Sequence, residues 1–273
     1  MLKNPNQPEL SLPEVLASYN HIELTEDERL SALIDAKRKK EALLKDQARE
    51  RRAAETRRKL VEVGWTYEQT KEYMLYRARN LFEDKFKIDQ DNQLAFDLLC
   101  HYFSNSKEFV SLALNAGVPN PSLEKGLLLA GNWGTGKTWM MRLFQKNNRR
   151  VYHVVEAKDL AILYKKAGDE AIVQYKQKIK NAFNDPSVFF QTEAALCVED
   201  IGAEDVKGNF GDKSNIVGDI VEGRYVNKCL VGWFHGTTNY TSEQLKEYYS
   251  GRVTSRLRES VNLIELGGPD RRK

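Results

Sequence analysis

The chain has 273 residues, of which 41% are hydrophobic and 30% are charged, and its formal net charge at pH 7 is +3. This length and apolar content suffice for one large or two smaller folded domains. The small net charge excludes a uniformly basic protein, so any nucleic-acid surface requires local clustering of charge. The separated cysteines Cys100, Cys197 and Cys229 form no C-x-x-C pair, which argues against zinc. The apolar runs are too short to span a membrane, and we expect a cytoplasmic protein.

One long helix is predicted near the start of the chain. A capping box at residues 25–28 opens a charged run without proline that continues to residue 63, and Gly64 is expected to end the helix. Its apolar stripe is narrow, and basic side chains gather at residues 37–40 and 49–59. The helix is therefore either a solvated charged helix or an arm that docks on a protein partner or a nucleic-acid backbone.

Three further helices are predicted before the middle of the chain. A second capping box at residues 66–69 opens a helix that runs towards Phe82. Apolar residues recur at helical spacing over residues 94–103, and residues 109–115 continue as a helix. We expect residues 1–84 to form a helical N-terminal region, for which binding of a partner is one of the two alternatives given above.

A phosphate-binding loop follows. It matches the pattern G-x-x-x-x-G-K-[ST] at every required position, with the residues Gly131, Asn132, Trp133, Gly134, Thr135, Gly136, Lys137 and Thr138. A short apolar strand is predicted before the loop and a helix from Trp139 after it, as the motif requires. Lys137 would reach the β- and γ-phosphates, and Thr138 would offer its hydroxyl to Mg²⁺. These eight residues and Trp139 are the candidate nucleotide-binding residues, although the chemistry requires nothing of Trp133.

Beyond the loop, apolar strands alternate with helical stretches, which is typical of a parallel sheet covered on both faces. Five strands are expected, at residues 127–130, 151–155, 194–198, 229–235 and 261–266. Residues 158–190 are expected to form a long helical insert with several lysines and aromatic residues. This insert could bind single-stranded nucleic acid, although lysines on a helix are more often only solvated.

Polar side chains follow two of the predicted strands. Glu199 and Asp200 come directly after residues 194–198, so we expect both carboxylates at the edge of the sheet beside the phosphates. By position, Glu199 is the candidate metal ligand together with Thr138, and Asp200 is the candidate that polarises the attacking water. Asn239, after the fourth strand, could hydrogen-bond the γ-phosphate or that water.

Two arginines are candidate catalytic residues that act between subunits. Arg252 and Arg256 lie four residues apart on a predicted helix, so they share one face. A guanidinium supplied to the nucleotide of a neighbouring subunit would stabilise the charge of phosphoryl transfer. The alternative is an ordinary surface helix rich in arginine and glutamate.

Together these stretches resemble the DnaC/DnaI-type helicase loaders and the IstB-like transposition ATPases, both of the AAA+ class. The resemblance covers residues 85–273 and includes the strand and loop at residues 126–138, the run 199–204, Arg224 with Tyr225, residues 237–239, and Arg252 with Arg256. The order of these motifs is specific to the group, whereas the phosphate-binding loop alone would not be.

The resemblance implies an α/β P-loop NTPase fold of the AAA+ type, with a five-stranded parallel sheet in the order 5-1-4-3-2 and no C-terminal helical lid. It implies ATP with Mg²⁺, a homo-oligomer with nucleotide at the subunit interfaces, and binding of single-stranded DNA. A loader would engage a replicative helicase through its N-terminal region. An IstB-type protein would instead bind duplex DNA and a transposase, and an ATP-gated interaction module with little hydrolysis is a third hypothesis.

The two acids depart from the family pattern. Glu199 stands where the family usually has aspartate, and Asp200 where many members have glutamate. These changes move the carboxylates by about an ångström, and a shift of that size can cost roughly a hundredfold in rate. We therefore expect slow hydrolysis. Arg271 resembles the family's terminal arginine only loosely.

Overall fold

The computed structural model divides the chain into two compact units, Met1–Arg58 and Lys59–Lys273. The predicted partner-binding region, residues 1–84, stays a prediction, since nothing in the fold identifies a partner. The structure describes residues 19, 22–62, 64–82, 86–181, 183, 191–204, 207–209 and 212–272.

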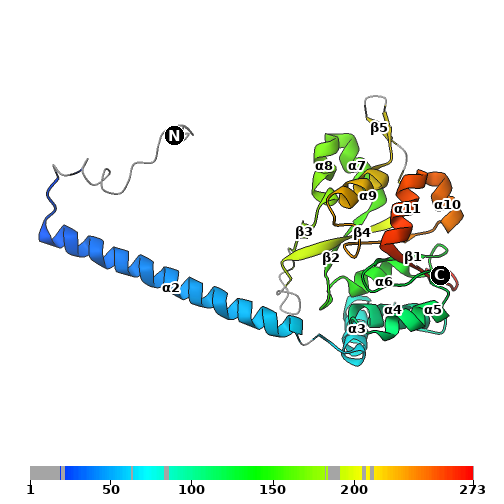
Figure 1. Cartoon of the computed structure of the whole chain (residues 1–273), viewed down its shortest axis with the longest axis horizontal. Coiled ribbons are helices and arrows are strands. Elements are labelled where there is room, and N and C mark those ends of the chain that lie inside the picture. Colours follow the sequence, from blue (N-terminus) through cyan, green and yellow to red (C-terminus); the bar gives the residue numbers. More distant parts are fainter. Residues whose placement is uncertain are drawn as a thin grey trace. The chain divides into compact units, whose positions relative to one another are not determined.

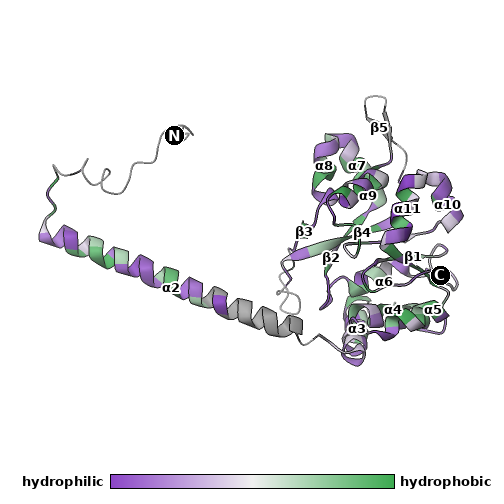
Figure 2. Cartoon of the chain, in the orientation of Figure 1, coloured by the Kyte–Doolittle hydropathy of each residue, from purple (hydrophilic) through white to green (hydrophobic). Residues whose placement is uncertain are grey.

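The long helix predicted near the start of the chain is α2 (Glu26–Glu62) (Figure 1). The predicted capping box is present: the Thr25 N–H donates to Glu28 Oε2 at 2.8 Å, and the Glu28 N–H donates to Thr25 Oγ1 at 3.3 Å. Hydrophobic and hydrophilic residues are interspersed along the first part of the helix (Figure 2), and residues 22–48 are all exposed. Over these residues α2 buries no apolar face.

The second unit alternates helices and strands after an all-helical start. Its helices are α3 (Tyr67–Phe82), α4 (Gln93–Phe103), α5 (Glu108–Asn115), α6 (Lys137–Phe144), α7 (Ala157–Ala167), α8 (Asp169–Val173), α9 (Ile216–Val226), α10 (Ser242–Tyr248) and α11 (Gly251–Ser260). Its strands are β1 (Gly126–Ala130), β2 (Tyr152–Glu156), β3 (Ile179–Lys180), β4 (Glu193–Ile201), β5 (Lys207–Asn209), β6 (Asp212–Ser214), β7 (Phe234–Thr238) and β8 (Val261–Glu265). The helices predicted over residues 66–82, 94–103 and 109–115 are confirmed.

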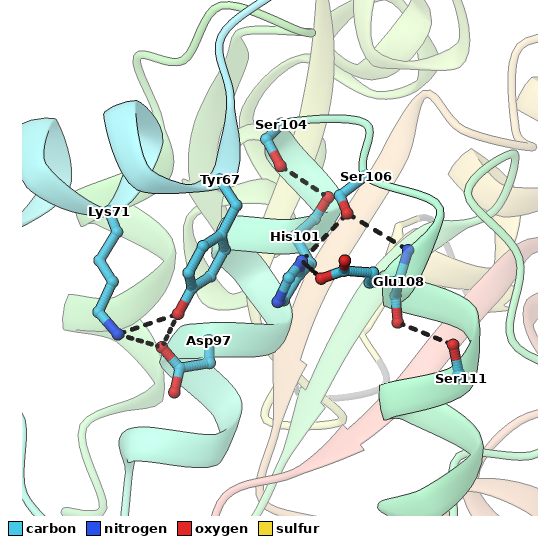
Figure 3. Close-up of polar contacts among 8 residues, drawn as sticks. All are labelled: Tyr67, Lys71, Asp97, His101, Ser104, Ser106, Glu108 and Ser111. Carbon is cyan, nitrogen blue, oxygen red and sulfur yellow. Dashed lines mark hydrogen bonds and ion pairs between the residues drawn. The ribbon is translucent and has the colours of Figure 1, made fainter.

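A polar cluster ties α3 to α4 (Figure 3). The Tyr67 hydroxyl donates to Asp97 Oδ1 at 2.7 Å, and Lys71 Nζ donates to the same oxygen at 3.0 Å. The Tyr67 ring stacks on His101 at a centroid distance of 4.0 Å, and His101 Nδ1 lies 3.7 Å from Glu108 Oε2 at the start of α5. These contacts fix α3 against α4 within the second unit.

Five parallel strands form the central sheet in the order β2-β4-β7-β1-β8, which confirms the predicted fold class and strand order. The two-residue strand β3 adds an antiparallel pairing to β4, and β5 pairs with β6 as a separate antiparallel ribbon. Because connections within a parallel sheet cross over its faces, helices cover both of them (Figure 1).

Side chains of β1 alternate between two hydrophobic cores. Leu127 and Leu129 pack with α3, α4, α5 and α6, whereas Leu128 packs with α7, α9, α10 and α11. All three leucines are buried, as the predicted continuous apolar strand requires. The carboxyl ends of the parallel strands are thereby held at one edge of a rigid sheet.

Two predicted elements differ from the structure. The fourth core strand is β7 (Phe234–Thr238) rather than residues 229–235, and a β-carbon on its Gly236 would lie 2.5 Å from Ile201 Cδ1. Gly236 is therefore a strand residue that a neighbouring side chain approaches closely. The insert at residues 158–190 is not one long helix, because it breaks at Gly168 (φ +65°) and continues as α8, a 3₁₀ turn and β3. Its residues 182 and 184–190 lie outside the described part.

Candidate nucleotide-binding site

The predicted phosphate-binding loop connects β1 to the N-terminus of α6. Gly136, which precedes the first residue of α6, has φ +99°, and Gly134 has φ +76°. Both values fall in the left-handed region that favours glycine. A β-carbon on Gly134 would also lie 1.8 Å from Asp270 Oδ1, so the Asp270 side chain leaves no room for a larger residue there. The backbone N–H groups at this helix N-terminus are suited to bind phosphate.

The Lys137 side chain is buried under the loop and held by three oxygens. Its Nζ donates to Gly131 O at 2.8 Å, to Asn132 O at 2.7 Å and to Asn239 Oδ1 at 2.7 Å. Burial lowers the pKa of this amine, while the negative charge of Asp200 opposes the shift. A triphosphate would offer stronger, charged acceptors to the same amine.

The predicted catalytic residues on β4 and after β7 meet beside this lysine. Asn239 Nδ2 donates to Asp200 Oδ1 at 3.2 Å while the Asn239 oxygen accepts from Lys137. The Asp200 N–H donates to Thr237 Oγ1 at 2.9 Å, and Asp200 has φ +54° where the pairing of β4 with β7 shifts register. Asp200 is thus turned out of the strand and towards the loop.

Glu199 is in a different environment from Asp200. Its side chain is 2% exposed, and Arg142 of α6 donates to both of its oxygens, Nε to Oε1 at 3.1 Å and Nη2 to Oε2 at 2.7 Å. Burial raises the pKa of this carboxyl, and the hydrogen bonds from Arg142 oppose that rise. Arg142 follows Thr138 by four residues, so the two side chains share one face of α6.

A cavity of about 790 Å³ opens over the loop and the two acids. Of the predicted nucleotide-binding residues, Gly134, Gly136, Lys137, Thr138 and Trp139 line it, together with Glu199, Asp200 and Asn239. Gly131, Asn132, Trp133 and Thr135 do not, and the exposed Trp133 has no contact that suggests a role.

Several residues of the cavity lining were not predicted: Phe86, Lys87, Asp89, Arg142, Glu156 and Arg272. Phe86 and Phe82 pack around Trp139, with a Phe82 to Trp139 centroid distance of 4.6 Å. A single sequence shows no pattern that brings Phe82, Phe86 or Asp89 to the loop. Arg142 could have been found, because its spacing from Thr138 places it on the same face of the helix.

The segment after β8 also reaches the cavity. The Arg271 N–H donates to Gly134 O at 3.0 Å, and Arg271 Nη2 donates to Asp89 Oδ1 at 2.8 Å. The Arg271 guanidinium lowers the pKa of Asp89. Arg271, whose resemblance to a family residue was loose, therefore connects the loop to the segment before α4.

Arg252 and Arg256 lie on one face of α11, as predicted, but outside the lining of this cavity. Both pair with Glu222 of α9, and the Arg256 guanidinium also lies 4.0 Å from the centroid of the Tyr225 ring. The Arg256 side chain is 11% exposed and that of Arg252 is 70% exposed. Of the two, Arg252 is the more exposed side chain.

The fold class implies Mg²⁺, and the available donors suit it. Thr138, Glu199 and Asp200 supply hydroxyl and carboxylate oxygens at one end of the cavity. Mg²⁺ at nucleotide sites takes one or two carboxylates in addition to substrate phosphates and water, so an all-protein cage is unnecessary. Among the described residues there is no cluster of three or more histidine, cysteine, aspartate or glutamate side chains that could hold a metal ion by itself.

The strand order, the loop after β1, the acids on β4 and the asparagine after β7 define a P-loop NTPase fold of the AAA+ type. No family model matches the chain, and no curated protein matches it significantly. None of the described helices has both the length and the apolar composition needed to cross a membrane.

Three solved structures of DnaA are similar to this chain. The AMPPCP-bound DnaA from Aquifex aeolicus has a TM-score of 0.42 and 20% sequence identity, and the match covers 68% of this chain and 50% of that chain. The replication initiator DnaA bound to AMPPCP and single-stranded DNA has a TM-score of 0.41 and 18% identity, with 68% of this chain and 49% of that chain covered. Domain III of the Thermotoga maritima replication initiation protein DnaA has a TM-score of 0.38 and 17% identity, with 68% of this chain and 67% of that chain covered. The chain spans about half the length of the first two.

Proposed function

We propose that this chain is a cytoplasmic, replication-related ATPase that binds ATP with Mg²⁺ in the cavity over the loop and hydrolyses it slowly. The observation that supports this best is the hydrogen-bonded chain from Lys137 through Asn239 to Asp200. These side chains come from three separate segments of the chain. If they only stabilised the fold, they would not need the glycine-lined loop that lies beside them.

Each residue has a role in this proposal. Lys137 binds the β- and γ-phosphates, Asp200 accepts a proton from the attacking water, and Asn239 orients that water. Thr138 and Glu199 would hold Mg²⁺, which neutralises developing charge on the phosphate oxygens. Arg252 or Arg256 of a neighbouring copy would complete the site, since phosphoryl transfer is catalysed mainly by positioned charge.

Binding of a fluorescent ATP analogue tests the site. Lys137→Ala is expected to abolish binding, whereas Lys158→Ala, which removes an exposed lysine on α7, is expected to leave the affinity unchanged. ATP affinity retained in Lys137→Ala would overturn the site assignment.

We further propose that the chain is a helicase loader, whose N-terminal residues engage a replicative helicase and whose ATPase domain binds single-stranded DNA. The order of the motifs along the chain supports this proposal, and the exposed, charged α2 is compatible with a docking arm. Co-purification from the protein's own cells is the test. Recovery of a hexameric helicase is the expected result, and recovery of a transposase would favour the IstB-type alternative.

A further inference from the structure

Arg142 lies between Glu156 and Glu199, two carboxylates that line the cavity with it. Glu156 ends β2 and Glu199 lies near the end of β4, and the two are register partners on these adjacent parallel strands. Arg142 Nη2 is 2.7 Å from Glu199 Oε2 and 3.7 Å from Glu156 Oε1. One guanidinium thus faces two acids, of which it binds Glu199 closely and Glu156 at the limit of an ion pair.

The two acids differ in their access to water. Glu199 is 2% exposed, whereas Glu156 is 52% and Arg142 is 48% exposed. As long as it is ionised, a buried carboxylate needs a cationic partner, because leaving the charge uncompensated is costly. Glu156 can do without one, because water solvates it. The Arg142 guanidinium can therefore leave Glu199 only when another cation takes its place there.

A metal ion at Thr138 would be that cation. Thr138 and Arg142 lie one helical turn apart on the same face of α6, and both line the cavity with Glu199 and Glu156. The bidentate contact from Arg142 occupies both oxygens of Glu199, so Arg142 and a metal ion compete for the same carboxylate.

We propose that Arg142 is a positioning residue for the divalent cation: it holds Glu199 in place and transfers to Glu156 when the cation binds the Glu199 oxygens. Glu156 thereby lowers the free-energy cost of moving Arg142 away from Glu199. This inference rests on the proposed ATP site, and it adds Arg142 and Glu156 to the residues that determine how tightly Mg²⁺ is held.

The test measures the Mg²⁺ midpoint for binding of a fluorescent ATP analogue, without any measurement of turnover. Glu156→Gln removes the charge that would receive Arg142, while keeping the shape of a half-exposed side chain. Since a partly exposed ion pair such as Arg142 with Glu156 contributes only modest binding free energy, the Mg²⁺ midpoint is expected to rise about two- to fivefold. Glu193→Gln is the matched control, because Glu193 is a half-exposed acid at the opposite end of β4, paired with Lys178 at 2.8 Å.

A double-mutant cycle separates transfer of Arg142 from a general loss of negative charge. In an Arg142→Gln background, Glu156→Gln is expected to produce no further shift in the Mg²⁺ midpoint. An equal shift in both backgrounds, or no shift in the single variant, would overturn the inference. Analogue binding by the wild type that does not depend on Mg²⁺ would also overturn it while leaving the ATP site intact. A wild type that binds no analogue at all would refute the proposed function and this inference with it.

Discussion

Acidification is expected to destabilise the second unit through His235 of β7. This side chain is fully buried, and its Nδ1 accepts a hydrogen bond from the Leu127 N–H of β1 at 3.0 Å. Because Nδ1 accepts, the imidazole is the neutral Nε2–H tautomer. Protonation would place a second donor against the Leu127 N–H in a site surrounded by aromatic rings, among them Tyr152 at a centroid distance of 5.0 Å.

The size of this loss of stability follows from the pKa of His235. Burial lowers the pKa of His235 to about 3, and nearby arginines, Arg150 first, add to the shift. The unfolded chain has the ordinary histidine pKa of about 6.5, so between these two values the unfolded state binds more protons than the folded state. The contribution of His235 to stability is therefore complete above about pH 6.5 and is lost as the pH falls. Between pH 7 and pH 5 this linkage amounts to about 2 kcal/mol.

Urea unfolding of the wild type and of His235→Asn at pH 7, 6 and 5 measures this effect. The asparagine Oδ1 can still accept from the Leu127 N–H but does not titrate. The variant has its own stability at pH 7, so the quantity of interest is the change with pH. The wild type is expected to lose about 2 kcal/mol more than the variant between pH 7 and pH 5. Parallel pH dependences in the two proteins would refute the argument.

Four substitutions test other parts of the structure. Asp200→Asn is expected to bind ATP but to lower turnover by about 10²–10⁴-fold, and an unchanged rate of phosphate release would remove Asp200 from its role. Gly134→Ala is expected to cost about 1–2 kcal/mol in thermal unfolding and to weaken nucleotide binding, whereas Gly267→Ala, with no atom within 4 Å of the added carbon, is its neutral control. Arg224→Met is expected to cost about 3 kcal/mol in urea unfolding, since the fully buried Arg224 side chain donates to three carbonyl oxygens that would lose their donor. Arg252→Ala is expected to lower turnover while thermal unfolding changes by less than about 0.5 kcal/mol, and full activity would argue against a shared site.

Local patterns in the sequence were sufficient for most elements of the fold. The capping boxes at Thr25 and Thr66 are present in the structure because they depend only on residues three positions apart. The apolar run of β1 likewise predicted a strand buried on both faces, because a continuous apolar run within one short segment indicates such a strand. By contrast, the predicted fourth strand stopped at residue 235, whereas β7 continues to Thr238 and Ile201 of β4 approaches its Gly236 across the sheet. Nothing local in the chain encodes that approach.

The sequence by itself determined that a phosphate-binding loop, two acids and an asparagine follow three of the predicted strands, and hence that they meet at one edge of a parallel sheet. Only the tertiary structure decided how the two acids differ. Glu199 is buried against Arg142, whereas Asp200 turns out towards Asn239 and Lys137. Neighbouring residues of a strand point in different directions, and the partner of each is set by packing between elements that are distant in the chain. The charges that surround a side chain therefore become known only when those elements are assembled.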